Sequence, residues 1–274
     1  MSEQRHQVRT QREEVADLPE GQSVIANGPL AGEPLERAVA EWGPDLVGTD
    51  SPRESFPLLV KILDAQKDLS VQVHPGEHDL DELPEGAESK DECWLILDAE
   101  ENGSILHGFA DDVDPEEFRR AVEENRAAQT LRRVDVEAGD VIRVVPNTIH
   151  AICEGVALLE IQQPSDTTYR VYDYNRPGLD GEPRELHLDR AMQVGNFSAH
   201  DDPKLVGRVT NSEVGDIEVL VDVDAYRIER FRPGHAVEWR VSDTSPQVVF
   251  VREGSVRLGC RENVVELEAA ETAI

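Results

Sequence analysis

The sequence predicts a mainly β protein, a β-sandwich or barrel, with a single helical insertion in its first half. Short apolar stretches of strand length recur along the chain, and Gly, Pro, Asp and Asn residues separate them. Strands and helices do not alternate as they do in a doubly wound parallel sheet. Neither a GxGxxG turn nor a Walker loop is present. These observations favour antiparallel sheets over a nucleotide-binding α/β fold.

The elements follow in order from the local patterns. Residues 1–22 are polar and aperiodic and are predicted to be disordered. From residue 23 the pattern predicts a short strand, an Asn-Gly turn and a helix over 34–42. Asp114 is placed as the N-cap, and Pro115 as the first residue, of a helical insertion over 114–133. Further strands are expected at 57–65, 69–74, 92–98, 103–109, 134–152 and 155–163. A domain over 23–192 and a second β-rich domain over 204–274 are therefore expected.

The charge and composition of the chain exclude several classes of function. The 274 residues include 57 Asp and Glu against 27 Lys and Arg, which gives a net charge of −30. Such a chain repels phosphate backbones and anionic lipid, so neither nucleic acid nor a membrane is expected as a partner. The sequence contains no apolar segment of spanning length, and its start has no apolar signal core, so a cytoplasmic location is expected. Three scattered cysteines, Cys93, Cys153 and Cys260, are too few for a disulfide framework.

The excess of carboxylates also suggests the medium in which the protein works. Only four of the 27 basic residues are lysines. Concentrated salt would screen the mutual repulsion of the carboxylates, since the Debye length is about 3 Å at 1 M. The composition therefore predicts a halophilic protein. The alternative is an acidic solubilising surface in an ordinary cytosol.

Two strand segments carry polar side chains on one face. In LSVQVHP, alternation places Ser70, Gln72 and His74 together. In KDECWLIL, Lys90 and Glu92 share a face of an otherwise apolar strand. A carboxylate in such a strand is costly unless it pairs with a cation or a metal. The simpler alternatives are a hydrogen-bonded polar row for the first segment and a salt bridge for the second.

A third segment adds a histidine. In GDVIRVVPNTIHAI a strand reaches a Pro146-Asn147 turn, and His150 follows on the next strand. Taken alone, His150 is more simply explained as a core residue whose hydrogen bonds are satisfied. Taken together, two imidazoles, one carboxylate and one amide oxygen form a mixed N/O set that suits zinc or a similar divalent ion.

These segments carry a family resemblance. The stretches FPLLVKILDAQKDLSVQVHP, KDECWLIL, VPNTIHAICEGVALLEIQQPSDTTYRVYDYNRPG and RELHLDRA resemble, in order, the short type I mannose-6-phosphate isomerases. The resemblance runs from about residue 24 to about residue 192 and is looser after 204. It implies a cupin (jelly-roll) β-sandwich with a helical insertion, followed by a second cupin-like domain that is curtailed at its C-terminal end.

The resemblance also implies an activity and a set of site residues. The activity is the metal-assisted interconversion of mannose 6-phosphate and fructose 6-phosphate through an enediol, with one Zn²⁺ per chain. The implied zinc ligands are Gln72, His74, Glu92 and His150. Ser70, Lys90 and Arg170 fall at substrate-binding positions, and Lys90, Glu160, Asp166 and Arg170 fall at catalytic positions.

Two other functions stay open at this stage. One is a metal- or sugar-binding cupin without turnover, and the other is a cupin isomerase or epimerase of a different phosphorylated sugar. In each case the expected partner is a small molecule. The chain is expected to be a monomer or a homodimer.

Overall fold

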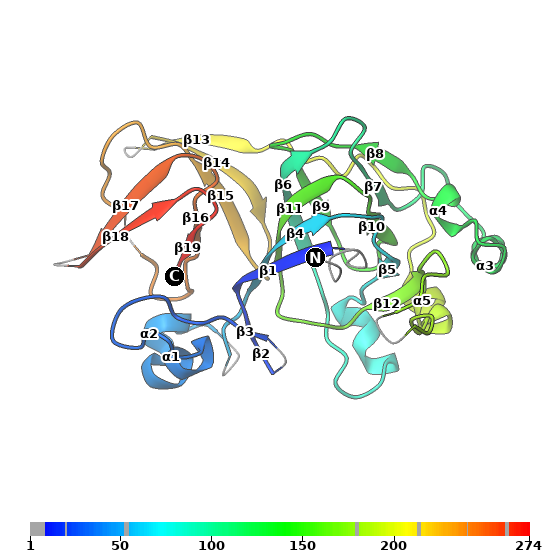
Figure 1. Ribbon diagram of the computed structural model, residues 1–274, viewed down its shortest axis with the longest axis horizontal. Helices are drawn as coiled ribbons and strands as arrows, with labels where there is room; N and C mark the ends of the chain where they lie inside the picture. Colours follow the sequence, from blue (N-terminus) through cyan, green and yellow to red (C-terminus); the bar gives the residue numbers. More distant parts are fainter. Residues whose placement is uncertain are drawn as a thin grey trace.

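Two five-stranded antiparallel sheets form the larger part of the molecule, on the right in Figure 1. The computed structural model describes residues 9–19, 21–51, 55–178, 181–212, 215–239, 241–260 and 263–274. The first sheet has the order β1-β4-β11-β6-β9, formed by Arg9–Val15, Leu59–Ala65, Val156–Gln162, Glu92–Ala99 and Val141–Val144. The second has the order β12-β5-β10-β7-β8, formed by Tyr169–Tyr172, Val71–Val73, His150–Ile152, Ser104–His107 and Arg133–Asp135. The predicted β-sandwich is confirmed, and most expected strands are present within a few residues of their predicted ends. The stretch 134–152 divides into β8, β9 and β10, and the strand expected from residue 23 is only a bridge between Val24 and Pro34.

Side-chain alternation explains the core between the sheets. From the first sheet Trp94 and Ile96 point inward, and they meet Ile105 and Ile152 of the second sheet. All four side chains are buried. Burying each large apolar side chain contributes about 1.5–3 kcal/mol, so this layer holds the two sheets face to face.

Helices cover the outer face of the second sheet, as Figure 1 shows. Phe118 and Val194 are among the buried residues on these helices and pack against Val71 and Val73 of β5. The helical insertion is confirmed, with Asp114 as N-cap, but it divides in two because Asn125 adopts a left-handed φ of 59°. The helices are α3 (Pro115–Glu123), α4 (Ala127–Thr130) and α5 (Leu188–Val194).

The N-terminal segment contains paired strands, contrary to the disorder predicted for it. Residues 1–22 were expected to be disordered, yet β1 (Arg9–Val15) pairs along β4, and β2 (Asp17–Leu18) pairs with β3 (Gly21–Gln22). The prediction is wrong there because the open edge of β4 offers backbone partners to a strand whose own sequence lacks apolar alternation. Residues 1–8 and 20 lie outside the described residues.

Further short elements link the sandwich to its surroundings. The helix expected over 34–42 is present as α1 (Leu35–Trp42). The described residues also include α2 (Pro44–Val47) and the 3-10 turn η2 (Glu77–Glu82). No helix of the described ranges is long and apolar enough to cross a membrane.

The C-terminal strands form smaller sheets beside the sandwich. They are β13 (Arg208–Ser212), β14 (Gly215–Asp222), β15 (Arg227–Phe231), β16 (Val249–Phe250), β17 (Ser255–Cys260), β18 (Asn263–Glu268) and β19 (Thr272–Ala273). They pair as β13-β14-β15, β16-β19 and β17-β18. Lys204 forms a bridge with Ile142 of β9, so the chain leaves the sandwich along its first sheet. We call residues 204–274 the C-terminal β region; its status as a second cupin-like domain stays a prediction.

The cap of α3 gives a first testable prediction. Asp114 Oδ1 accepts hydrogen bonds from the backbone N–H groups of Glu116 (2.8 Å) and Glu117 (3.2 Å). Asp114→Ala is expected to lower the free energy of unfolding by about 1 kcal/mol, measured by urea denaturation, because it removes these acceptors. Asp111→Ala, an exposed acidic residue just upstream, is the control. An equal loss in both variants would contradict a specific capping role.

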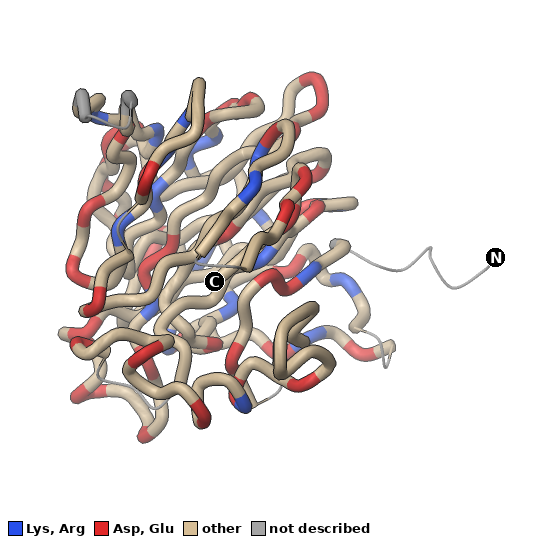
Figure 2. The backbone as a smooth tube through the Cα atoms, turned by 90° about the vertical axis from the view of Figure 1, so that its left-hand side faces the viewer, with Lys and Arg blue, Asp and Glu red and all other residues tan. Residues whose placement is uncertain are grey.

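The charge distribution gives a second prediction. Figure 2 shows Asp and Glu spread over strands and loops rather than gathered in one patch. Because the net charge is −30, lowering the salt concentration should strengthen repulsion over the whole surface. The melting temperature is expected to fall between molar salt and ~0.05 M, a range over which the Debye length grows several-fold. A melting temperature that is constant or rises over this range would contradict the halophilic interpretation.

Candidate metal centre

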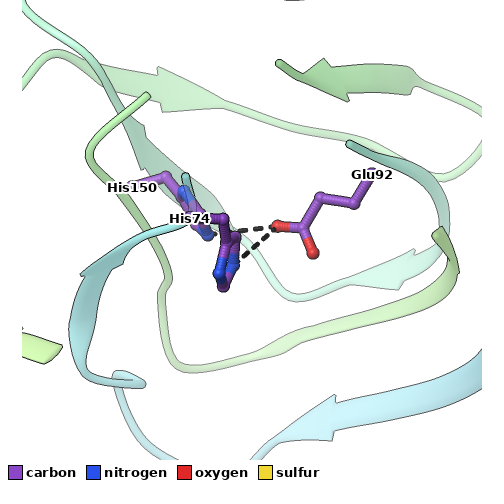
Figure 3. A group of neighbouring side chains, drawn as sticks. All are labelled: His74, Glu92 and His150. Carbon is purple, nitrogen blue, oxygen red and sulfur yellow. Dashed lines mark ion pairs between the residues drawn. The ribbon is translucent and has the colours of Figure 1, made fainter. Parts of the chain in front are cut away.

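Three buried side chains from three strands converge at one end of the sandwich (Figure 3). His74 directly follows β5, Glu92 opens β6 and His150 opens β10. Glu92 Oε1 lies 3.1 Å from His150 Nε2 and 3.6 Å from His74 Nε2. The exposed fractions of His74, Glu92 and His150 are 2%, 0% and 1%. The cluster is therefore shielded from bulk water.

The pairing of the strands explains why these residues meet. In the second sheet Gln72 is the register partner of both His150 and Arg170, so the three side chains form a row across neighbouring strands. Gln72 Nε2 lies 3.3 Å from His150 Nε2. Glu92 reaches the same space from the first sheet, where it pairs with Gln162 and Val144. The cluster therefore brings together side chains from both sheets.

Hydrogen bonds orient the two imidazoles. His74 Nδ1 lies 2.9 Å from the Thr167 carbonyl oxygen, and His150 Nδ1 lies 2.8 Å from the Thr148 carbonyl oxygen. A carbonyl only accepts, so Nδ1 carries the proton in both rings and Nε2 faces Glu92. Burial, with a further contribution from Lys90, lowers the pKa of His74 to about 4, so its ring is neutral at pH 7.

Lys90 makes the second charged contact of Glu92. Its Nζ lies 3.0 Å from Glu92 Oε2, so the salt bridge that the sequence offered as an alternative is present in addition to the histidine contacts. Burial works against the charge of Lys90, but Glu92 and Glu160 outweigh it and raise the pKa of Lys90. Burial likewise opposes the charge of Glu92, while Lys90 and His74 hold the pKa of Glu92 well below its usual range.

The other predicted site residues differ in their exposure to solvent. Ser70 is buried just before β5, and Glu160 is buried on β11 next to β6. Asp166 is exposed in the loop before β12, yet its charge also raises the pKa of Lys90. Arg170 lies on β12, and its Nη1 donates to the Glu185 carbonyl oxygen at 2.9 Å.

One charged residue of this neighbourhood was not predicted from the sequence. Lys61 of β4 is buried, and its Nζ lies 3.5 Å from Glu160 Oε2. The two residues are register partners in the first sheet. Alternation along β4 places Lys61 on the inner face with Leu59 and Leu63, so a lysine in an apolar strand was the signal that could have revealed it.

The donor atoms fit a divalent cation. His74 Nε2 and Glu92 Oε1 are buried and have no hydrogen-bond partner within the described residues. The ligand atoms of His74, Glu92 and His150 all lie within 4.8 Å of one another. A neutral imidazole lone pair that faces a buried carboxylate is unfavourable unless a cation lies between them. Imidazole nitrogen and carboxylate oxygen are ligands that Zn²⁺ takes, and a half-turn of the Gln72 amide would offer an oxygen as well.

Known proteins with similar sequences place the chain in a family. Residues 15–113 match the model of the type I phosphomannose isomerase catalytic domain. The putative mannose-6-phosphate isomerase YvyI of Bacillus subtilis (strain 168) is 40% identical over 254 residues, which cover 92% of this chain and 78% of that protein. The chain belongs to the type I mannose-6-phosphate isomerase family.

Two further family members define the extent of the likeness. The probable mannose-6-phosphate isomerase GmuF of B. subtilis (strain 168) is 41% identical over 206 residues, or 75% of this chain, and the chain spans 63% of the length of GmuF. The crystal structure of the mannose 6-phosphate isomerase from B. subtilis superposes with a TM-score of 0.83 at 32% identity, and the match covers 94% of this chain and 80% of that one. The predicted fold class is therefore confirmed by a solved member of the family.

The cluster predicts the behaviour of two histidine variants. His74→Ala and His150→Ala are each expected to abolish stoichiometric binding of Zn²⁺, because each removes an imidazole ligand from the set. The measurement is metal content by elemental analysis after equilibration with Zn²⁺ and gel filtration. His78→Ala, an exposed histidine on η2, is the control and should keep its metal. Full metal content in both cluster variants would show that the site is assigned to the wrong residues.

Proposed function

We propose that the chain is a zinc-dependent isomerase that interconverts mannose 6-phosphate and fructose 6-phosphate. The observation that carries the proposal is the buried His74–Glu92–His150 cluster with Lys90 paired to the same carboxylate, in a chain of this family. A carboxylate with two imidazoles is sufficient for metal binding alone. The added lysine supplies a positive charge that catalysis on an anionic substrate requires.

The proposed ligands are Gln72, His74, Glu92 and His150. The Thr167 and Thr148 carbonyls fix the tautomers of the two imidazoles, and Lys90 holds the second oxygen of Glu92. When bound, Zn²⁺ supplies a Lewis acid that stabilises negative charge on a sugar oxygen. The surrounding chain supplies the orientation and the proton-transfer groups.

The charge of the substrate requires local cations. A sugar phosphate approaches a protein with a net charge of −30, so the site itself must attract it. Lys90 and Arg170 are the proposed cations, with Ser70 as a neutral hydrogen-bonding partner. A guanidinium presents a planar fork that matches a phosphate or diolate, whereas an ammonium acts as a point charge.

Aldose–ketose isomerisation also moves a proton between C1 and C2 of the sugar. We assign this proton transfer to the carboxylates of Glu160 and Asp166. The negative charges of both residues raise the pKa of Lys90, so both belong to the surroundings of this lysine. Lys61 forms an ion pair with Glu160, with Nζ 3.5 Å from Oε2. The proposal assigns the two carboxylates and Lys90 jointly to proton transfer and to stabilisation of the enediolate.

The activity itself is directly measurable. Conversion of mannose 6-phosphate is coupled to a dehydrogenase that reports glucose 6-phosphate after isomerisation of fructose 6-phosphate. The reaction is assayed in molar and in low salt, before and after chelation, and after Zn²⁺ is restored. Turnover that is lost on chelation and regained with Zn²⁺ would support the proposal. Stoichiometric zinc without turnover would favour the binding cupin, and turnover of only another aldose phosphate would favour the third function.

The two cations give the next prediction. Lys90→Ala and Arg170→Ala are expected to lower kcat on the order of 10²–10³-fold, because each removes a group that stabilises developing negative charge. Arg170→Lys should remain impaired, since an ammonium does not reproduce a bidentate fork. The measurements are kcat and KM on zinc-loaded proteins, with folding checked by circular dichroism in molar salt.

A matched control separates this role from general charge effects. Lys67→Ala removes an exposed lysine and should leave kcat unchanged. Wild-type kcat in both Lys90→Ala and Arg170→Ala would contradict the assigned roles, whatever their effect on stability. The cytoplasmic location and the choice between monomer and homodimer remain predictions from the sequence.

A further inference from the structure

The C-terminal β region packs against the strand that carries Glu92, and Tyr226 also reaches the residue that precedes Glu92. Tyr226 lies in the turn between β14 and β15 and is only 6% exposed. Its ring packs with Cys93 of β6 and Val141 of β9 in one apolar cluster. Its hydroxyl donates a hydrogen bond to Asp91 Oδ1. Asp91 lies between Lys90 and Glu92 in the sequence, so Tyr226 is linked through the Asp91 side chain to the segment that carries both residues.

Both oxygens of Asp91 are occupied on this rear side. Arg143 Nη2 donates to Asp91 Oδ2 at 2.7 Å, while Tyr226 holds Oδ1. Arg143 belongs to β9, next to β6 in the first sheet. Strand alternation points Asp91 away from the face on which Lys90 and Glu92 lie. The carboxylate of Asp91 is therefore an anchor and has no access to the cluster.

The backbone of the same segment is fixed as well. The Asp91 N–H donates to Gln163 Oε1 at 2.9 Å, and the Gln163 N–H donates to the Asp91 carbonyl at 3.2 Å. The Lys90 N–H donates to the Pro75 carbonyl at 3.1 Å, next to His74. Among the described contacts, Tyr226 provides the one side-chain tie from the C-terminal β region to the Asp91 carboxylate.

We propose that Tyr226 is a positioning residue for the metal centre, which acts through Asp91 to fix the backbone from which Glu92 and Lys90 extend. The inference rests on the proposed metal site. It gives the C-terminal β region a role in the reaction although none of its residues belongs to the His74–Glu92–His150 cluster. Partners outside a ligand shell orient the ligands, and their loss typically weakens metal affinity or activity about 10–100-fold.

The test uses Tyr226→Phe, which removes the hydroxyl and keeps the ring in its apolar cluster. The Zn²⁺ dissociation constant is measured by competition with a chromophoric chelator, in molar salt. We expect Zn²⁺ to bind about tenfold more weakly, at the lower end of the range for residues that act through a ligand's neighbour. Tyr174→Phe, a half-buried tyrosine beside Tyr172, is the matched control and should bind Zn²⁺ as the wild type does.

Coupling between Tyr226 and Asp91 provides the second measurement. If the hydroxyl acts through Asp91, Tyr226→Phe should have no further effect on zinc affinity in an Asp91→Ala background. Wild-type zinc affinity in Tyr226→Phe, with only a lower melting temperature, would overturn the proposal and leave Tyr226 as an interface residue. A wild-type protein that binds zinc but does not convert mannose 6-phosphate would overturn the proposed isomerase, while the zinc comparison would still decide the role of Tyr226.

Discussion

The buried carboxylate of Glu92 is the constraint on which the rest of the site depends. An ionised carboxylate removed from water costs several kcal/mol unless nearby groups compensate for it. Here one oxygen faces two imidazole nitrogens and the other faces Lys90. The ends of β5 and β10 in the second sheet and of β6 in the first sheet must therefore lie close together. The sandwich and its register follow from this requirement as much as from the apolar core.

The register of the strands keeps that geometry rigid. Side chains alternate along a strand, so a slip of one residue in β6 would turn Glu92 and Lys90 outward and bring Asp91 and Cys93 inward. The pairing of Glu92 with Gln162 and Val144 on either side opposes such a slip. The contacts of Asp91 on the rear face oppose it too, since its partners would be lost. Support from behind the strand thus complements the ligands in front of it.

Local pattern predicted part of this arrangement and could not predict the rest. Alternation alone placed Lys90 and Glu92 on one face, and the Asp114-Pro115 pair marked the start of α3. The meeting of His74 with Glu92 joins two sheets, and no spacing encodes it. The chemistry of the donor set suggested it, and the family resemblance implied it. β1 was missed because its partner supplies the strand pairing, and Tyr226 was missed because its contact with Asp91 spans 135 positions.

The distribution of lysine shows where this acidic chain places its few ammonium groups. Of the four lysines in the sequence, Lys61 and Lys90 are buried beside Glu160 and Glu92, while Lys204 pairs with Asp140. A surface charge on such a protein is readily screened by salt, but a buried charge is screened much less. The ion pairs inside the sandwich therefore persist when salt weakens the surface field. Salt therefore acts mainly on the surface carboxylates and much less on the buried ion pairs beside the metal centre.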